Sequence, residues 1–161
     1  MKAELKKVGF KVTTPDFPNT ENPKLTEWLQ YFKKQVSVNS GTILIGHSLG
    51  VSFILRFLEA FTGKKAIKAA FLVSGFERSL GTPETDNFVV KPFNWQKIKA
   101  ACRKFVVINS DNDPYVPLSK AKDLAANLGT KVILIKNGGH LNEKAGYTRF
   151  ELLLERVKGM I

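Results

Sequence analysis

The chain has 161 residues and a net charge of +11, and 43% of its residues are hydrophobic, so it fits one domain, residues 1–161, with a full core. Its basic residues are scattered in pairs such as Lys6-Lys7 and Lys64-Lys65, which argues against nucleic acid as a partner, since such proteins gather basic residues on one face. The first ten residues lack the apolar segment of a signal peptide, and no stretch approaches the roughly 18 apolar residues of a membrane span. We therefore expect a cytoplasmic protein that does not enter a membrane.

Helix and strand patterns alternate from the N-terminus onward. Residues Gly9–Thr14 are predicted to form a short strand that ends at Pro15. Asn22 is then expected to cap a helix that has Pro23 in its first turn. Four apolar residues follow at the spacing of one helix face: Leu25, Trp28, Leu29 and Phe32.

The middle of the chain contains two apolar runs of strand length, Thr42–Gly46 and Ala69–Ser74. An amphipathic helix pattern separates them, and it ends near Gly63. The stretch from Gly75 to Pro92 is irregular and rich in Gly, Pro, Thr and Asn, which suits either a loop over a site or a plain surface excursion.

The C-terminal third continues the alternation. It contains, in order, a short helix over 93–102, a strand over 105–109, a helix over 121–128 closed by Gly129, a strand over 132–135 and a helix over 150–157. Continuous apolar strands separated by amphipathic helices indicate a parallel sheet with helices on both faces. The predicted fold class is therefore α/β.

The pentapeptide Gly46–Gly50, GHSLG, matches the pattern G-x-S-x-G. It leaves an apolar strand and opens an amphipathic helix, which is the arrangement of a nucleophile elbow. The flanking glycines allow the tight turn that holds the serine above the sheet, and the helix that starts at Leu49 directs free N–H groups toward it. Ser48 is therefore predicted to be a nucleophile.

A serine nucleophile needs a base, and histidine is the usual one. The chain contains only His47 and His140. His47 is adjacent to Ser48, and neighbouring side chains diverge in a tight elbow, so we expect it to act in packing or hydrogen bonding. His140 follows the last predicted strand in a loop with two glycines and is the predicted base.

A carboxylate is expected to orient the histidine. Asp111 and Asp113 both follow the strand over 105–109. Asp113 is favoured because Pro114 and Pro117 make the backbone beyond it rigid, although spacing alone separates the two aspartates only weakly. The chain order Ser, Asp, His is the order found in α/β-hydrolases.

Several segments beyond this motif resemble the small serine hydrolases related to retinoblastoma-binding protein 9 and bacterial YdeN. They cover nearly the whole chain from Gly9: PDFPNTENPKLTEWL, GHSLG, KPFNWQKI, SDNDPYVPLSKAKDLAANLG and NGGHLNEKAGYTRFELLLE. The resemblance implies a compact α/β-hydrolase without a large lid. It also implies that the aspartate of the D-x-x-V-P segment, here Asp113, belongs to the catalytic triad.

The N-terminus departs from this family's pattern. Members begin with an apolar strand that ends in a His-Gly loop, and a helix then leads to the strand that starts here at Gly9. This chain begins inside that helix, at Met1–Lys7. The resemblance therefore implies that a strand from the middle of the sheet is missing, together with a loop that supplies one of two oxyanion donors. The backbone N–H of Leu49 is the other donor that the resemblance implies. We expect Met1 to be a truncated start.

These patterns predict a serine hydrolase that cleaves a small ester, thioester or amide through an acyl-enzyme on Ser48. Such a mechanism needs no metal and no cofactor, and its expected partner is a small-molecule acyl substrate. The alternative is a catalytically impaired hydrolase-like module that binds a partner protein, which the missing N-terminal strand would favour.

Overall fold

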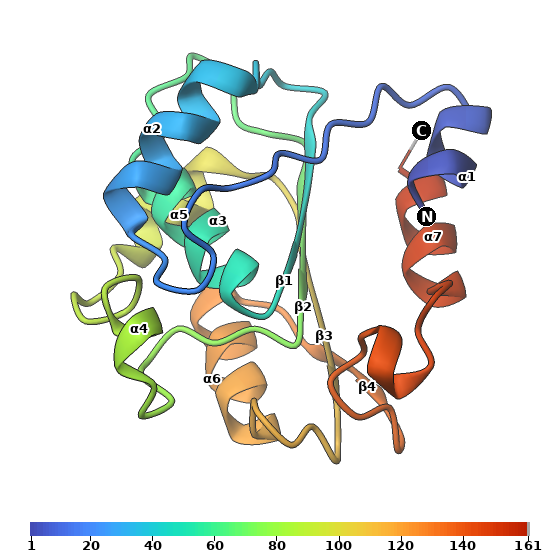
Figure 1. The fold of residues 1–161 in the computed structure, drawn as a ribbon. Helices are drawn as coiled ribbons and strands as arrows, with labels where there is room; N and C mark the ends of the chain where they lie inside the picture. Colours follow the sequence, from blue (N-terminus) through green and yellow to red (C-terminus); the bar gives the residue numbers. More distant parts are fainter. Residues whose placement is uncertain (161) are drawn as a thin grey trace.

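A computed structural model describes residues 1–160 and contains one four-stranded sheet between two layers of helices (Figure 1). The strands lie in the order β1-β2-β3-β4, and all neighbouring pairs are parallel. This confirms the predicted α/β class. The bounds of the strands are β1 Ile43–His47, β2 Ala69–Val73, β3 Phe105–Ser110 and β4 Val132–Ile135.

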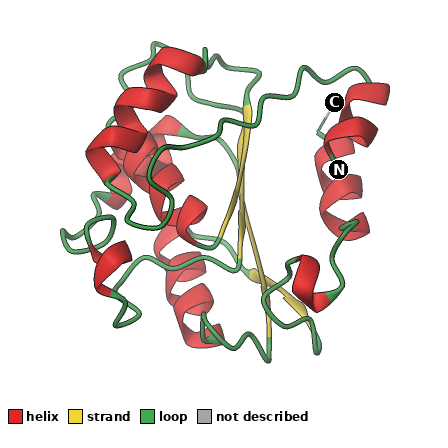
Figure 2. Cartoon of the chain, viewed as in Figure 1, coloured by secondary structure: helices red, strands yellow, loops and turns green. Residues whose placement is uncertain are grey.

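The two layers of helices differ in size (Figure 2). The larger layer holds α2 (Leu25–Gln35), α3 (Leu49–Glu59), α4 (Pro83–Asp86), α5 (Trp95–Ala101) and α6 (Leu118–Leu128). The smaller layer holds α1 (Lys2–Lys7) and α7 (Glu151–Lys158), and a short 3-10 helix, Glu143–Ala145, precedes α7. Each layer encloses its own hydrophobic cluster against one face of the sheet.

The burial of each strand follows its place in the sheet. All five residues of β2 are buried, because strands pair with it on both sides and helices cover both faces. β1 lies at an edge, and the Ile45 side chain on it is 39% exposed. The carboxyl ends of all four strands meet at one rim of the sheet, where sites form in such folds.

The strand predicted over Gly9–Thr14 is not formed, and this prediction is wrong. Phe10 donates its N–H to the carbonyl of Leu5, but residues 11–16 form no backbone hydrogen bond with any described residue. This segment leaves the layer of α1 and α7 and crosses to the layer of α2 and α3 (Figure 1). It stays extended without ladder bonds because the sheet ends at β1, so no strand lies alongside it.

The start of α2 also corrects a prediction. Asn22 does not cap this helix; it begins at Leu25 with Lys24 at the N-cap position and no side-chain cap there. A distant residue supplies the acceptor instead, since Oδ1 of Asn87 accepts the Leu25 N–H at 2.7 Å. Nδ2 of Asn87 donates to the carbonyl of Pro23 at 2.9 Å. A tertiary contact therefore replaces the local cap.

The irregular stretch 75–92 is anchored to the domain rather than being a plain surface excursion. Arg56 of α3 donates from Nε to the carbonyl of Phe88 at 2.8 Å, and its guanidinium lies 3.6 Å from the ring centroid of Phe93. Arg56 also forms an ion pair with Glu59 at 2.8 Å. Because this guanidinium is almost fully buried, its contacts fix the path of the chain between α4 and α5.

Candidate active site

Ser48 occupies the sharp turn between β1 and α3. Its φ of 53° and ψ of −122° lie in a strained region for a residue with a side chain. Its N–H donates to the carbonyl of Val73 at 2.9 Å, which ties the turn to β2. A Cβ at Gly46 would come within 2.7 Å of the carbonyl oxygen of Gly50, whereas a Cβ at Gly50 would meet nothing within 4 Å. Of the two flanking glycines, only Gly46 lies where there is no room for a side chain.

Helix α3 begins at Leu49, immediately after the serine, as the sequence predicted. The N–H groups of a first helical turn have no partner within their own helix, and they carry the positive end of its dipole. The N–H of Leu49 is one of these groups. An anion that forms on an atom bonded to Ser48 Oγ would therefore lie near a donor.

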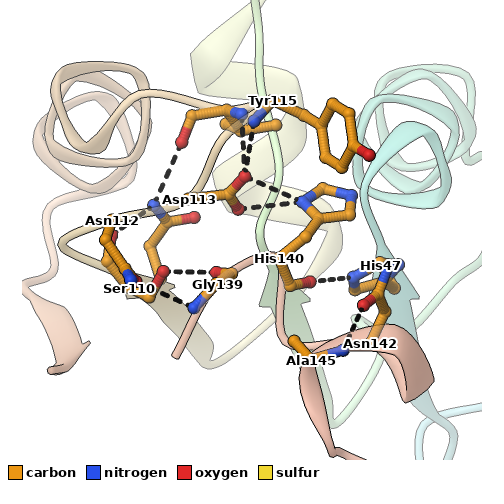
Figure 3. Close-up of polar contacts among 11 residues, drawn as sticks. His47, Ser110, Asn112, Asp113, Tyr115, Gly139, His140, Asn142 and Ala145 are labelled. Carbon is orange, nitrogen blue, oxygen red and sulfur yellow. Dashed lines mark hydrogen bonds and ion pairs between the residues drawn. The ribbon is translucent and has the colours of Figure 1, made fainter. Parts of the chain in front are cut away.

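Asp113 and His140 are joined by a hydrogen bond at the rim of the sheet (Figure 3). Nδ1 of His140 lies 2.9 Å from Oδ2 and 3.0 Å from Oδ1 of Asp113, and the aspartate side chain is fully buried. Oδ1 also accepts the backbone N–H groups of Tyr115 and Val116, each at 2.9 Å. Burial by itself would raise the pKa of Asp113, but these hydrogen bonds outweigh it and hold the pKa below its ordinary value.

The loop that carries His140 is fixed by polar residues at the end of β3 and directly after it (Figure 3). Oδ1 of Asn112 accepts the N–H of Gly139 at 2.8 Å, and the hydroxyl of Ser110 donates to the Gly139 carbonyl. Oδ1 of Asp111 accepts the N–H of Asn137 at 2.7 Å. Asp111 therefore has a structural contact. Sequence reasoning missed Ser110 and Asn112, although a run of polar residues at the end of a buried strand is a signal for such contacts.

His47 holds the same loop from the other side. Its Nε2 lies 2.7 Å from the backbone carbonyl of His140, so Nε2 carries the proton and donates it. The two imidazole rings are tilted at 64° with centroids 4.6 Å apart. Burial lowers the pKa of His47, and it outweighs the hydrogen bond to the His140 carbonyl, which raises that pKa. The hydrogen-bonding role predicted for His47 is confirmed.

Ser48 is less tightly connected than the other two predicted residues. Among the described residues no hydrogen bond joins Ser48 Oγ to the His140 imidazole, although the adjacent His47 contacts the His140 backbone. Catalytic hydrogen bonds are often long in enzymes without substrate and tighten when substrate binds. The structure thus pairs Asp113 with His140 and places Ser48 at the end of the strand that contacts the His140 loop.

Residues 1–160 contain no group of three or more histidine, cysteine, aspartate or glutamate side chains placed to hold a metal ion. None of the helices within that range is both long and apolar enough to cross a bilayer. The reactive groups at the rim are the Ser48 hydroxyl, the imidazoles of His47 and His140 and the carboxylate of Asp113.

Comparison with known proteins decides the family. The family model for serine hydrolases matches residues 4–158. The chain belongs to the serine hydrolase family. Two relatives in this family are YdeN of Bacillus subtilis, 34% identical over 157 residues, and serine hydrolase RBBP9 of Rattus norvegicus, 27% identical over 155 residues. These matches cover 96% and 95% of this chain, and 83% and 79% of the relatives.

Two solved structures share the fold of this chain. The crystal structure of YdeN superposes with a TM-score of 0.94 at 34% identity, covering 99% of this chain and 87% of that one. A meta-cleavage product hydrolase from Pseudomonas fluorescens superposes with a TM-score of 0.60 at 12% identity, over 90% of this chain and 74% of that one. The second match shows the α/β-hydrolase fold alone. The family model and the relatives YdeN and RBBP9 support a hydrolase.

Proposed function

We propose that this protein hydrolyses a small ester, thioester or amide through an acyl-enzyme on Ser48, with His140 as general base and Asp113 as its orienting carboxylate. The observation that carries the proposal is the bond between the buried Asp113 carboxylate and Nδ1 of His140. A carboxylate at Nδ1 fixes the proton there, so Nε2 keeps its lone pair for a serine hydroxyl.

The reaction would proceed in two displacements. Nε2 of His140 takes the Ser48 hydroxyl proton while Oγ attacks the acyl carbon, which forms a tetrahedral intermediate with its oxyanion near the N–H of Leu49. The imidazolium then protonates the leaving group as the acyl–heteroatom bond breaks. His140 then deprotonates a water molecule, which attacks the acyl carbon. The bond to Ser48 Oγ breaks, Oγ takes the proton back from the imidazolium, and the acid leaves. Asp113 stays ionised throughout and stabilises the imidazolium.

The oxyanion site of the chain as described has one assigned donor, the N–H of Leu49. Removing one donor from an oxyanion hole costs about 10²–10³ in rate in a well-studied protease. The expected turnover is therefore low compared with that of a hydrolase with two donors. A strained serine and a preorganised histidine remain, so acylation by a reactive probe should still occur.

The second candidate function is a hydrolase-like module that binds a partner protein and performs little chemistry. The edge of β1 that has no strand partner within residues 1–160 favours it, because an unpaired strand edge is a template for another polypeptide. The two functions differ in what happens at Ser48, since only the hydrolase requires a reactive hydroxyl.

A fluorophosphonate probe separates the two. The hydrolase should be labelled once per chain, and Ser48→Ala should lose the label while keeping its circular dichroism spectrum and melting temperature. Ser119→Ala, an exposed position on α6, is the matched control and should label fully. A folded wild-type protein that takes up no probe, or a Ser48→Ala variant labelled to the same extent, would contradict the hydrolase proposal.

A further inference from the structure

Tyr115 presents a large aromatic surface beside the imidazole of His140. The two ring centroids lie 4.9 Å apart, and the ring planes make an angle of 75°. Tyr115 is nevertheless 62% exposed, whereas His140 is 8% exposed. The contact with the imidazole therefore uses one part of the phenol ring and leaves most of the ring open to solvent.

The backbone that carries this ring is held by the same carboxylate that holds the imidazole. Oδ1 of Asp113 accepts the N–H groups of Tyr115 and Val116, each at 2.9 Å, and Val116 is fully buried. Pro114 and Pro117 flank the two residues and restrict the backbone on either side. The phenol ring is thus attached to a rigid segment, so packing a ligand against it requires little ordering of the chain.

The ring lies toward the nitrogen of His140 that would transfer protons. Nδ1 is bound to Asp113, so Nε2 is the nitrogen left for this step. Figure 3 shows the phenol hydroxyl and Nε2 on the same side, away from Asp113. In the proposed reaction Nε2 donates its proton to the heteroatom of the leaving group, which must lie within about 3 Å of it. The atoms bonded to that heteroatom therefore lie next to the phenol ring.

We propose that Tyr115 determines substrate specificity by packing against the leaving group, and that the preferred substrates are esters or thioesters whose alcohol or thiol carries a flat aromatic ring. This inference rests on the proposed function. A tyrosine side chain offers a broad, rigid contact area and loses little conformational freedom when a ligand covers it. Contact between two aromatic rings should favour such a substrate by about 2- to 10-fold in kcat/KM.

The order of the reaction assigns the ring to the leaving group rather than to the acyl group. The acyl group stays bonded to Ser48 Oγ after the first displacement. Nε2 meets the leaving heteroatom first and the attacking water afterwards, at the same place. The exposed face of Tyr115 gives the alcohol a path to solvent and the water a path in.

The test compares two esters of one acid, benzyl acetate and cyclohexylmethyl acetate. Both leaving groups are primary alcohols with a six-membered ring, but only benzyl alcohol has a flat one. The wild type should prefer benzyl acetate, and Tyr115→Leu should lower the ratio of the two kcat/KM values by about 2- to 10-fold. A general defect in the site would slow both esters alike and would not change this ratio.

Two variants serve as controls. Tyr115→Phe keeps the flat ring and should keep the preference for benzyl acetate. Tyr31→Leu makes the same change to a half-buried tyrosine of α2 that packs on Phe17, and it should also keep the preference. Equal melting temperatures would show that all three variants keep the fold.

Binding can be measured without turnover. His47 and His140 are the two histidines of the chain, so a histidine-labelled Ser48→Ala protein gives a simple imidazole NMR spectrum. Benzyl acetate should shift the His140 signals, and adding Tyr115→Leu should raise its Kd by about 2- to 10-fold. If the wild type hydrolyses neither ester, the hydrolase proposal fails, and this change in Kd alone decides whether Tyr115 binds an aromatic group.

Three outcomes would overturn the role of Tyr115. They are the same ratio of kcat/KM values in the wild type and Tyr115→Leu, an equal loss of preference in Tyr115→Phe and Tyr115→Leu, and the same Kd for benzyl acetate with and without the phenol ring.

Discussion

The two halves of the rim at the carboxyl ends of the strands differ in how fully their polar groups are hydrogen-bonded. In the half formed by β3 and β4, the side chains of Asp111, Asn112 and Asp113 all accept backbone N–H groups. In the half formed by β1 and β2, one edge of β1 has no strand partner among the described residues. Ser74 Oγ and the Glu77 carboxylate there are buried without a hydrogen-bond partner, although Oε1 of Glu77 forms an ion pair with Nε of Arg78 at 3.3 Å. On β3, Oδ1 of Asn109 is also buried without a hydrogen-bond partner.

This difference means that His140 is held firmly in place, whereas Ser48 has fewer contacts around it. The imidazole of His140 is held by a buried carboxylate and by the bond from His47 to its own carbonyl, so its position needs nothing from outside the described chain. The serine half lacks such support beyond the elbow itself. Unsatisfied buried polar groups cost free energy, and they concentrate where a structure stores strain or meets another group.

The largest effect should come from removing the proposed nucleophile, Ser48, which lies in the half formed by β1 and β2. Ser48→Ala is expected to lower kcat for a p-nitrophenyl ester by about 10⁶, the loss seen when the serine of a comparable triad is removed. Steady-state absorbance measures the rate, and an equal melting temperature shows that the fold is kept. A residual rate within tenfold of wild type would place the chemistry elsewhere.

In the half formed by β3 and β4, Asp113→Asn should lower kcat by about 10⁴, because an amide favours the wrong tautomer of His140. The matched control is Asp111→Asn, which keeps an oxygen for the N–H of Asn137 and should retain nearly full activity. Burst kinetics with the same ester would show whether the acylation step is the one that slows. Equal losses in the two variants would show that the loop, and not the imidazole, is affected.

Glu77 offers a stability test in the half formed by β1 and β2. Burial raises the pKa of Glu77, so ionising it in the folded state is unfavourable and stability falls as pH rises from its unfolded pKa toward its folded one. Glu77→Met removes the carboxylate and should stabilise the fold at neutral pH by about 1–3 kcal/mol in urea unfolding. The gain should shrink near pH 4. Glu84→Met, at an exposed position on α4, should change little.

Asp113 should show the opposite pH dependence. Its pKa is lowered in the folded state, so its contribution to stability is present above the unfolded pKa of about 3.9 and is lost as pH falls through the folded value. Urea unfolding of the wild type and Asp113→Asn should therefore converge as the solution is acidified below that point. A constant difference down to about pH 2 would show that the charge of Asp113 contributes nothing.

The smallest effect concerns His47. Because its pKa is lowered in the folded state, the unfolded chain binds a proton first, and the protein should lose stability as pH falls below the unfolded value of about 6.5. His47→Gln should remove this pH-dependent loss while keeping a donor for the His140 carbonyl. Melting temperatures at neutral and mildly acidic pH give the comparison. An unchanged slope in the variant would assign the loss to another group.

Local patterns predicted much of this molecule correctly. The sheet class, the turn at Ser48 and the helix from Leu49 follow from apolar periodicity and from glycine placement, which act over a few residues. Gly129 closes α6 with a φ of 70°, as its position after the apolar stripe indicated. The strand over 9–14 and the cap at Asn22 were predicted wrongly. The first lacks a neighbouring strand to pair with, and at the second Asn87, far away in the chain, accepts the N–H of Leu25.

The sequence alone determined which residues could be reactive and in which order they occur along the chain, because hydroxyl, imidazole and carboxylate chemistry belongs to the side chains themselves. Only the tertiary structure decided which aspartate meets His140, which residues hold its loop, and which edge of the sheet is left unpaired. Those outcomes depend on contacts between segments tens of residues apart, and no local spacing encodes the distance between two strand ends. Asp111 and Asp113 are two residues apart in the chain, yet the fold brings only the second to the imidazole.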